Sequence, residues 1–281
     1  MTKKISFQGN LGAYSDLACR KAFPDMETLP CALFSEAFAA LSDGRSDLAM
    51  IPIDNSIAGR VADIHHLLPQ SNLHIIGEEF IPIHHCLLAP RGASLHGLKK
   101  VYSHIHALPQ CRDFIQTHNL EAIVHGDTAK SAKTIAEKQD PTCAAIASEL
   151  AAELYDLEIL EQNIEDEDHN TTRFIILSRD PVTPPYQKDK TYVTSILFRV
   201  RSIPAVLYKA LGGFATNGIN LTKLESYMVK GHFTAAQFYC DVESHPDDPS
   251  LQLALDELGF YAEEIRIVGS YEAHPFRSEL N

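Results

Sequence analysis

Short apolar runs alternate with amphipathic helical patterns over the first 180 residues, and this alternation constrains the fold most. It is typical of an α/β protein, in which helices cover the faces of a sheet. The predicted strands are Lys4–Gln8, Leu48–Ile53, Leu73–Ile76, Glu79–Ala89, Lys100–Ser103, Ala122–His125, Ala144–Ala147 and Arg173–Ser178. The predicted helices are Ser15–Phe23, Phe34–Asp43, Val61–Leu68, Leu108–Thr117, Thr128–Glu137 and Glu149–Tyr155.

A proline-rich break ends this region. Residues 181–190 contain Pro181, Pro184 and Pro185 followed by charged residues, and prolines at this density cannot continue a sheet. Beyond the break the predicted elements follow the order βαββαβ, which is that of a ferredoxin-like sandwich. They are Thr191–Val200, Pro204–Phe214, Ile219–Met228, Thr234–Val242, Pro249–Leu258 and Glu264–Val268, with Gly231 between the two central strands. We therefore expect one domain at 1–180, a linker at 181–190 and a second domain at 191–275.

The composition excludes several classes of protein. The chain has 281 residues and a formal net charge of −13, which argues against a surface for nucleic acid or an anionic membrane. No apolar run approaches the roughly 20 residues that span a bilayer. The N-terminus runs directly into a strand pattern without a signal-peptide core, so a cytoplasmic location is expected. The six scattered cysteines predict buried residues or free thiols, not a disulfide framework.

Metal ligation is not indicated by the histidines or by the acidic residues. His65-His66 and His84-His85 are adjacent pairs, which lack the i, i+4 spacing of a helical zinc site. The acidic stretch at 161–168 lacks the alternating ligands and central glycine of a calcium loop. We therefore expect no metal and no cofactor.

Four polar clusters stand at the ends of predicted strands. They are Gly9–Ser15, Pro52–Gly59, Ser103–Cys111 and Asn170–Phe174. Strand ends are where α/β folds bind ligands, and an arginine beside hydroxyls and amides offers charge-assisted donors to a carboxylate or phosphate. Each cluster alone fits a tight turn, a helix cap or a surface ion pair as well. Since no motif of a nucleophilic enzyme accompanies them, they favour binding of a small anion over covalent catalysis.

Taken in order, these clusters resemble those of prephenate dehydratases over nearly the whole chain. Asp127-Thr128-Ala129 and Ala144–Ser148 extend the collinear match. The resemblance implies an α/β catalytic domain with the two-lobed fold of type 2 periplasmic binding proteins, and a C-terminal ferredoxin-like ACT regulatory domain. The implied activity is that of a lyase, which converts prephenate to phenylpyruvate, carbon dioxide and water in phenylalanine synthesis. L-Phenylalanine would inhibit it as an allosteric ligand at ACT interfaces of a homodimer or homotetramer.

The resemblance also assigns residues to a site between the lobes. The catalytic residues would be Thr172, Arg173 and Phe174; the substrate-binding residues Asn55, Ser56, Ser103, Gln110, Tyr14 and Ser15; and the allosteric residues Pro204, Ala205, Val206, Leu207, Leu224, Glu225 and Ser226. In this hypothesis Thr172 donates a hydrogen bond to the leaving hydroxyl, Arg173 clamps a carboxylate and Phe174 excludes water. We favour the pyruvyl carboxylate, because a clamp on the departing one would oppose its loss.

The sequence departs from the family pattern at a few positions, and these leave alternatives open. Asp54 replaces the usual Glu, Ala13-Tyr14 the usual Thr-Phe, and His106 the common Gln. Tyr227-Met228 replaces the Arg-Pro that usually follows Glu225-Ser226, so the regulatory amino acid stays open. An arogenate dehydratase and a non-catalytic amino-acid sensor are the alternative functions.

Overall fold

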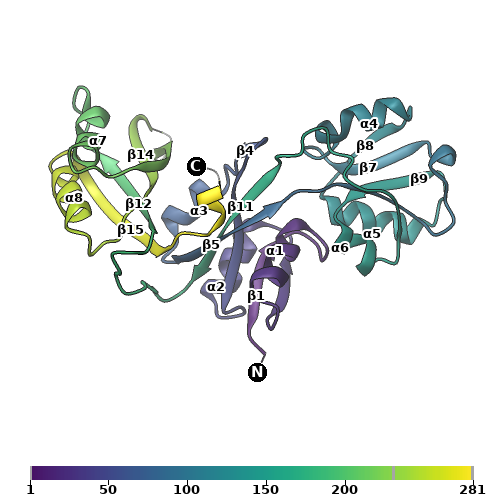
Figure 1. Cartoon of the computed structure of the whole chain (residues 1–281), viewed down its shortest axis with the longest axis horizontal. Helices are drawn as coiled ribbons and strands as arrows, with labels where there is room; N and C mark the ends of the chain where they lie inside the picture. Colours follow the sequence, from purple (N-terminus) through teal and green to yellow (C-terminus); the bar gives the residue numbers. More distant parts are fainter. Residues whose placement is uncertain (1, 230–231, 280–281) are drawn as a thin grey trace. The chain divides into compact units, whose positions relative to one another are not determined.

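The computed structural model describes residues 2–229 and 232–279, and Figure 1 shows the path of the chain. The chain forms two compact units: unit 1 comprises Met1–Val61 and Glu79–Phe174, and unit 2 comprises Ala62–Glu78 and Ile175–Asn281. Residues 181–190 form no helix or strand. The predicted domain boundaries on either side of that segment stay a prediction.

The first sheet of unit 1 is built from parallel strands. β1 (Lys4–Gln8) pairs in parallel with β2 (Glu27–Cys31) and with β3 (Leu48–Asn55), and β4 (Gly59–Arg60) pairs antiparallel with β3. Helices α1 (Tyr14–Ala22) and α2 (Phe34–Ser42) pack against β1. Parallel strands connected by helices are buried on both faces. This burial accounts for the nearly continuous apolar runs of the sequence.

The second sheet of unit 1 has the order β10-β6-β9-β7-β8. Its strands are β6 (Cys86–Ala89), β7 (Lys100–His104), β8 (Glu121–His125), β9 (Cys143–Ala147) and β10 (Glu158–Glu161). Its helical segments are η1 (Leu95–Gly97), η2 (Leu108–Cys111), α4 (Arg112–Thr117), α5 (Thr128–Lys138) and α6 (Glu149–Leu154). Ala144 and Ile146 of β9 join one apolar cluster, whereas Ala145 and Ala147 join another. This alternation is the period of two that puts successive strand residues on opposite faces.

Unit 2 contains the predicted βαββαβ order. Its elements are β12 (Tyr192–Val200), α7 (Val206–Thr216), β13 (Leu221–Val229), β14 (His232–Val242), α8 (Pro249–Tyr261) and β15 (Ala262–Glu272), followed by α9 (Phe276–Glu279). The strands are antiparallel in the order β13-β14-β12-β15. Ile196, Phe198 and Phe214 belong to the core between this sheet and its helices. The mixed α/β class and the βαββαβ order are therefore confirmed.

A segment from earlier in the chain also belongs to unit 2. It contains α3 (Ile64–Gln70) and the first residues of β5 (His74–Pro82). Arg266 of β15 donates hydrogen bonds to the carbonyls of Leu68 and Ser71 at 3.1 and 2.9 Å, which satisfies carbonyls at the end of α3. Gly269 pairs with Ile75, and a Cβ on Gly269 would lie 2.0 Å from the Ile75 oxygen. Only glycine permits this approach.

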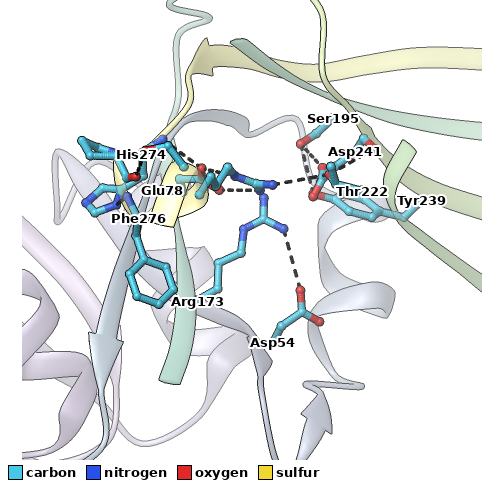
Figure 2. A network of polar contacts seen from close by, with 12 residues as sticks. Asp54, Glu78, Arg173, Ser195, Thr222, Tyr239, Asp241, His274 and Phe276 are labelled. Atoms are coloured by element: carbon cyan, nitrogen blue, oxygen red, sulfur yellow. Dashed lines mark hydrogen bonds and ion pairs between the residues drawn. The ribbon is translucent and has the colours of Figure 1, made fainter. Parts of the chain in front are cut away.

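Polar side chains of unit 2 form two further groups; Figure 2 labels Glu78 of the first and Ser195, Tyr239 and Asp241 of the second. Arg277 of α9 donates to Glu78 at 2.6 and 2.8 Å. The buried carboxylate of Asp241 accepts from Ser195 at 2.5 Å and from Tyr239 at 2.7 Å. Both carboxylates are thus compensated by donors within the unit, as burial requires.

The strand predictions were wrong in two respects. β2, β4 and β10 were missed; β2 contains Pro30, which argues against a central strand but is tolerated at a sheet edge. The segments predicted as Leu73–Ile76 and Glu79–Ala89 are in fact β5 and β6, separated by residues 83–85. The polar pair His84-His85 interrupts the apolar residues at this break, but the prediction carried one strand through it.

Three predicted helices differ in their beginning or type. The helix predicted from Pro204 begins at Val206, because Ala205 has a left-handed φ of 56° and Pro204 therefore lies outside it. The helix predicted over Leu108–Thr117 begins as the 3-10 segment η2 and continues as α4. The helix predicted over Val61–Leu68 is α3, which begins three residues later, at Ile64. Gly231 lies outside the described residues.

The cysteines are buried free thiols, as predicted: Cys19, Cys31, Cys86, Cys111, Cys143 and Cys240. Among residues 2–229 and 232–279, no helix has the length and apolar character needed to cross a membrane. The same described residues contain no group of three or more His, Cys, Asp or Glu side chains placed to hold a metal ion.

Candidate active site

Asn55, at the end of β3, sets the direction of a polar network in unit 1. Its Oδ1 accepts hydrogen bonds from the backbone N–H groups of Ile57 and Ala58 at 3.0 and 2.7 Å. Only the amide oxygen can accept, so Nδ2 must face the other way. There it donates to Asn170 Oδ1 at 2.7 Å and to Thr172 Oγ1 at 2.9 Å. The side chain of Asn55 thus closes a tight turn and also belongs to the polar cluster, so the two alternative interpretations of this segment are compatible.

Thr172, at the start of β11 (Thr171–Ser178), is oriented by this contact. Its hydroxyl accepts from the Asn55 amide and has one hydrogen of its own to donate. Within the described part of the chain, that hydrogen has no acceptor. Thr172 is half-buried and can therefore act as a hydrogen-bond donor to a bound molecule.

Gln110, in η2, belongs to the same network. Its Oε1 accepts from Nδ2 of the buried Asn170 at 3.0 Å and lies 2.9 Å from Nε2 of His85. In the described segments no protein group accepts from the Gln110 Nε2. Gln110 also lines a cavity, so this second donor is available to a ligand.

The cavity has a volume of about 410 Å³, which is of the size that holds a small organic molecule. It is lined by Ile57, Ala58, His106, Pro109, Gln110, Arg112, Asp113, Asp166 and Glu167. The Asp166 carboxylate accepts from the backbone N–H groups of Arg112 and Asp113 at 3.0 and 3.1 Å, at the N-terminus of α4. These two hydrogen bonds offset the negative charge of the Asp166 carboxylate. The side chains of Arg112 and His106 add hydrogen-bond donors to the lining of the cavity.

Arg173 and Phe174 lie apart from this network. The Arg173 guanidinium is only 7% exposed and its Nη1 lies 3.8 Å from Asp54 Oδ2 (Figure 2), which is an ion-pair distance and too long for a hydrogen bond. Neighbouring strand residues point to opposite faces. Thr172 and Asn55 therefore share one face, while Arg173 and Asp54 share the other. Phe174 is fully buried.

The other predicted substrate-binding residues make contacts within the chain. Ser56 donates to the His169 carbonyl at 3.0 Å, and the fully buried Ser103 donates to the Ile146 carbonyl at 2.6 Å. Each hydroxyl has therefore used its hydrogen. Tyr14 Oη lies 2.7 Å from the His84 carbonyl oxygen. Ser15 is buried in the first turn of α1. Their role in substrate binding stays a prediction.

The loop Gly9–Ser15 packs against the second sheet's helices. Gly12 has a φ of 89°, and a Cβ on it would lie 2.9 Å from the Cα of Ala151. Its N–H donates to the Asp16 carboxylate at 2.8 Å, and its carbonyl accepts from Ser148 at 2.5 Å. Close packing therefore requires glycine at position 12. The interpretation of this loop as a tight turn is sufficient to explain that glycine.

The predicted allosteric residues lie in unit 2. Pro204 and Ala205 precede α7, Val206 and Leu207 begin it, and Leu224, Glu225 and Ser226 lie on β13. Glu225 pairs with Lys223 at 3.4 Å. Their regulatory role stays a prediction.

The sequence interpretation missed two members of the network. His85 was considered only as a metal ligand, and Asn170 only as part of a motif. The one local signal was the polar pair His84-His85 inside an apolar stretch, at the point where β5 ends and β6 begins.

Comparison with known proteins decides the family. The model of the family "Prephenate dehydratase" matches residues 5–182, which is more than half of the chain. This chain belongs to the prephenate dehydratase family. Its members are hydro-lyases.

Relatives of this family match almost the whole chain. A protein of Komagataeibacter europaeus, named a bifunctional N-acyl-homoserine lactone acylase/prephenate dehydratase, is 51% identical over 97% of this chain and 97% of its own length. A chloroplastic arogenate dehydratase/prephenate dehydratase of Arabidopsis thaliana is 39% identical over 95% of this chain and 72% of its own length. The crystal structure of an Arthrobacter aurescens prephenate dehydratase in complex with L-Phe is 29% identical, with a TM-score of 0.89 over 98% of this chain and 91% of that one.

Proposed function

We propose that this protein converts prephenate to phenylpyruvate, carbon dioxide and water. The observation that supports the proposal is the orientation of Thr172. Asn55 donates to its hydroxyl at 2.9 Å, so the hydroxyl hydrogen is available to the hydroxyl group that leaves the substrate ring. Membership of the prephenate dehydratase family supplies the reaction.

The main requirement for catalysis is assistance to the departure of the ring hydroxyl group. The bond between the ring and its carboxylate breaks, its electrons enter the ring, and the C–O bond to the ring hydroxyl breaks. The products are carbon dioxide, hydroxide that takes up a proton, and an aromatic ring, whose formation drives the reaction. Thr172 is too weak an acid to release a proton outright, so it donates a hydrogen bond and relays a proton from water. General-acid assistance of this kind contributes about 10²–10⁴ in rate.

The remaining donors bind the substrate's other oxygens. Gln110 and Arg112, which line the cavity, supply an amide nitrogen and a guanidinium for this purpose. Arg173 holds the pyruvyl carboxylate in our hypothesis, and Phe174 contributes to the exclusion of water from the reacting ring.

The test is turnover of prephenate by the purified protein at neutral pH, with phenylpyruvate as the measured product. Acid must be avoided because acid alone aromatises prephenate. We expect turnover well above the rate without enzyme, and a much lower rate in the Thr172→Ala variant. A wild-type rate no higher than the rate without enzyme contradicts the proposal. Calorimetry that detects L-phenylalanine binding without prephenate turnover would favour an amino-acid sensor.

Arogenate is the competing substrate, because the Arabidopsis relative carries both activities in its name. The two substrates differ only by an ammonium in place of a ketone. The cavity offers carboxylates from Asp113 and Glu167 that could receive an ammonium. Values of kcat/KM for both substrates, measured in parallel, decide between them.

A second candidate activity is hydrolysis of an N-acyl-homoserine lactone. The Komagataeibacter relative, at 51% identity, has this acylase in its name. Water would add to the amide carbonyl and the C–N bond would break, releasing a fatty acid and homoserine lactone. Mass spectrometry of these products, with wild type and Thr172→Ala, tests the activity and whether it depends on the proposed dehydratase site.

We further propose that residues 191–275 form an ACT domain that binds L-phenylalanine in a homo-oligomer. Support comes from the ferredoxin-like strand order and from the Arthrobacter complex. Adding L-phenylalanine should lower the rate of prephenate turnover. Unchanged rates at millimolar L-phenylalanine, with intact wild-type turnover, contradict this regulation and direct the search to another amino acid.

Exposed apolar residues on α7 and α8 support self-association. Tyr208 is 82% exposed and Phe260 is 72% exposed, and exposed apolar surface of this kind marks an interaction site where it is contiguous. We expect the double variant Tyr208→Glu, Phe260→Glu to have a lower molar mass in solution than the wild type, measured by light scattering. The matched control is Lys209→Glu, a charge change on the same helix. An unchanged mass in the double variant excludes this surface as the interface.

A further inference from the structure

We propose that His85 is a positioning residue for the dehydration. As the neutral tautomer with its hydrogen on Nε2, it holds the oxygen of Gln110, so that the Gln110 amide nitrogen faces the substrate as a donor. This inference rests on the proposed function, since it concerns the same site. His85 itself does not touch the substrate.

The argument starts at the backbone. The N–H groups of Ile57 and Ala58 can only donate, and they fix the Asn55 oxygen toward themselves. The Asn55 nitrogen therefore faces Asn170, which must present its oxygen at 2.7 Å. The backbone N–H groups of Ile57 and Ala58 therefore determine the orientation of both side-chain amides, that of Asn55 and that of Asn170.

The same logic continues to His85. With its oxygen toward Asn55, Asn170 presents Nδ2 to Gln110 at 3.0 Å, so Gln110 must present Oε1. That oxygen lies 2.9 Å from His85 Nε2, and an oxygen opposite a ring nitrogen requires a hydrogen on the nitrogen. His85 therefore carries its hydrogen on Nε2.

The far side of the ring is consistent with a neutral imidazole. His85 is 1% exposed, and burial lowers its pKa from the usual value. Its Nδ1 lies 2.9 Å from Tyr14 Oη, which also donates to the His84 carbonyl at 2.7 Å, so the single phenol hydrogen is shared between these two acceptors. Burial raises the pKa of Tyr14 well above its usual value, so this phenol stays protonated. The nearest carboxylate, Glu165, accepts from the backbone N–H of His85 at 2.8 Å.

The consequence for the substrate lies at Gln110. Two donors hold the Gln110 oxygen, Asn170 Nδ2 at 3.0 Å and His85 Nε2 at 2.9 Å. If His85 lacked a hydrogen on Nε2, or were absent, only the Asn170 hydrogen bond would oppose a half-turn of the Gln110 amide, which would present its oxygen to the cavity. A carbonyl oxygen would repel the carboxylates and the departing hydroxide of prephenate. The imidazole thus acts on the reaction through one hydrogen bond to Gln110, and catalysis depends on such preorganised donors.

Two measurements on the full-length protein test the proposal. The first is the tautomer of His85, read from long-range ¹⁵N–¹H correlations and assigned with the His85→Gln variant. We expect the hydrogen on Nε2 in the wild type. A hydrogen on Nδ1 overturns the proposal, whatever the protein's activity.

The second measurement compares variants. His85→Leu, which has no donor, should lower kcat for prephenate about tenfold with a smaller change in KM, whereas His85→Gln should restore most of kcat because its amide can donate to Gln110. His84→Leu, at the exposed neighbouring histidine, is the matched control and should retain kcat. Equal kcat in His85→Leu and wild type, or an equal loss in the leucine and glutamine variants when both are folded by circular dichroism, overturns the proposal. A failure of the proposed function can be told apart from a failure of this inference. In that case the wild type would not turn over prephenate at all, whereas the tautomer of His85 could still be measured.

Discussion

Replacing Thr172 by alanine is expected to lower kcat for prephenate by about 10²–10⁴-fold, since that is the usual contribution of a donor to a leaving group. Asn55 orients the hydroxyl by donating to it, so the variant loses a donor that is already directed. Thr172→Ser keeps a hydroxyl at the same atom and should retain most of kcat. Steady-state kinetics at neutral pH measure the effect.

The neighbouring Thr171 supplies a matched control. Its backbone N–H and carbonyl, not its side chain, bond to Ser56, so Thr171→Ala removes the same atoms without removing the proposed donor. It should keep near-wild-type kcat. If Thr172→Ala also keeps near-wild-type kcat with an unchanged melting temperature, the assignment of Thr172 is wrong.

The second large effect is expected from Arg173→Lys, which should raise KM for prephenate by roughly 10–100-fold through the loss of a bidentate guanidinium contact. The pyruvyl carboxylate remains in the product, so its clamp binds ground state and transition state alike. Loss of such uniform binding raises KM and leaves kcat nearly unchanged. A clamp on the departing carboxylate would behave differently, because its removal would raise kcat.

The position of Arg173 makes this result informative. Its contact with Asp54 at 3.8 Å lies on the strand face opposite Thr172, so a purely structural role predicts a lower melting temperature with unchanged kinetics. The kinetic and thermal measurements therefore separate binding from folding. Arg91→Lys, at an exposed arginine that pairs with Asp156, is the control and should change neither.

Local pattern predicted most of the elements that build the core. The strand predicted at Lys4–Gln8 and the helix predicted at Thr128–Glu137 follow from periodicity, and the helix extends to Lys138 in the structure, where Asp127 caps it by accepting from Lys130 N at 2.6 Å. The division between β5 and β6 was missed, because apolar residues flank the His84-His85 pair on both sides and two polar residues alone do not show that the chain leaves one sheet and enters another. Periodicity reports which residues are buried and not which sheet receives them.

The sequence by itself determined the α/β class, the βαββαβ order and the motifs that carry family membership, because these depend on residue identity and short spacings. Only the tertiary structure decided the chemistry of the site. The hydrogen bond that directs Thr172 comes from Asn55, 117 positions away in the chain. Whether a hydroxyl or amide donates or accepts depends on such distant partners, and so does the face on which Arg173 lies. Spacing along the chain carries no information about either.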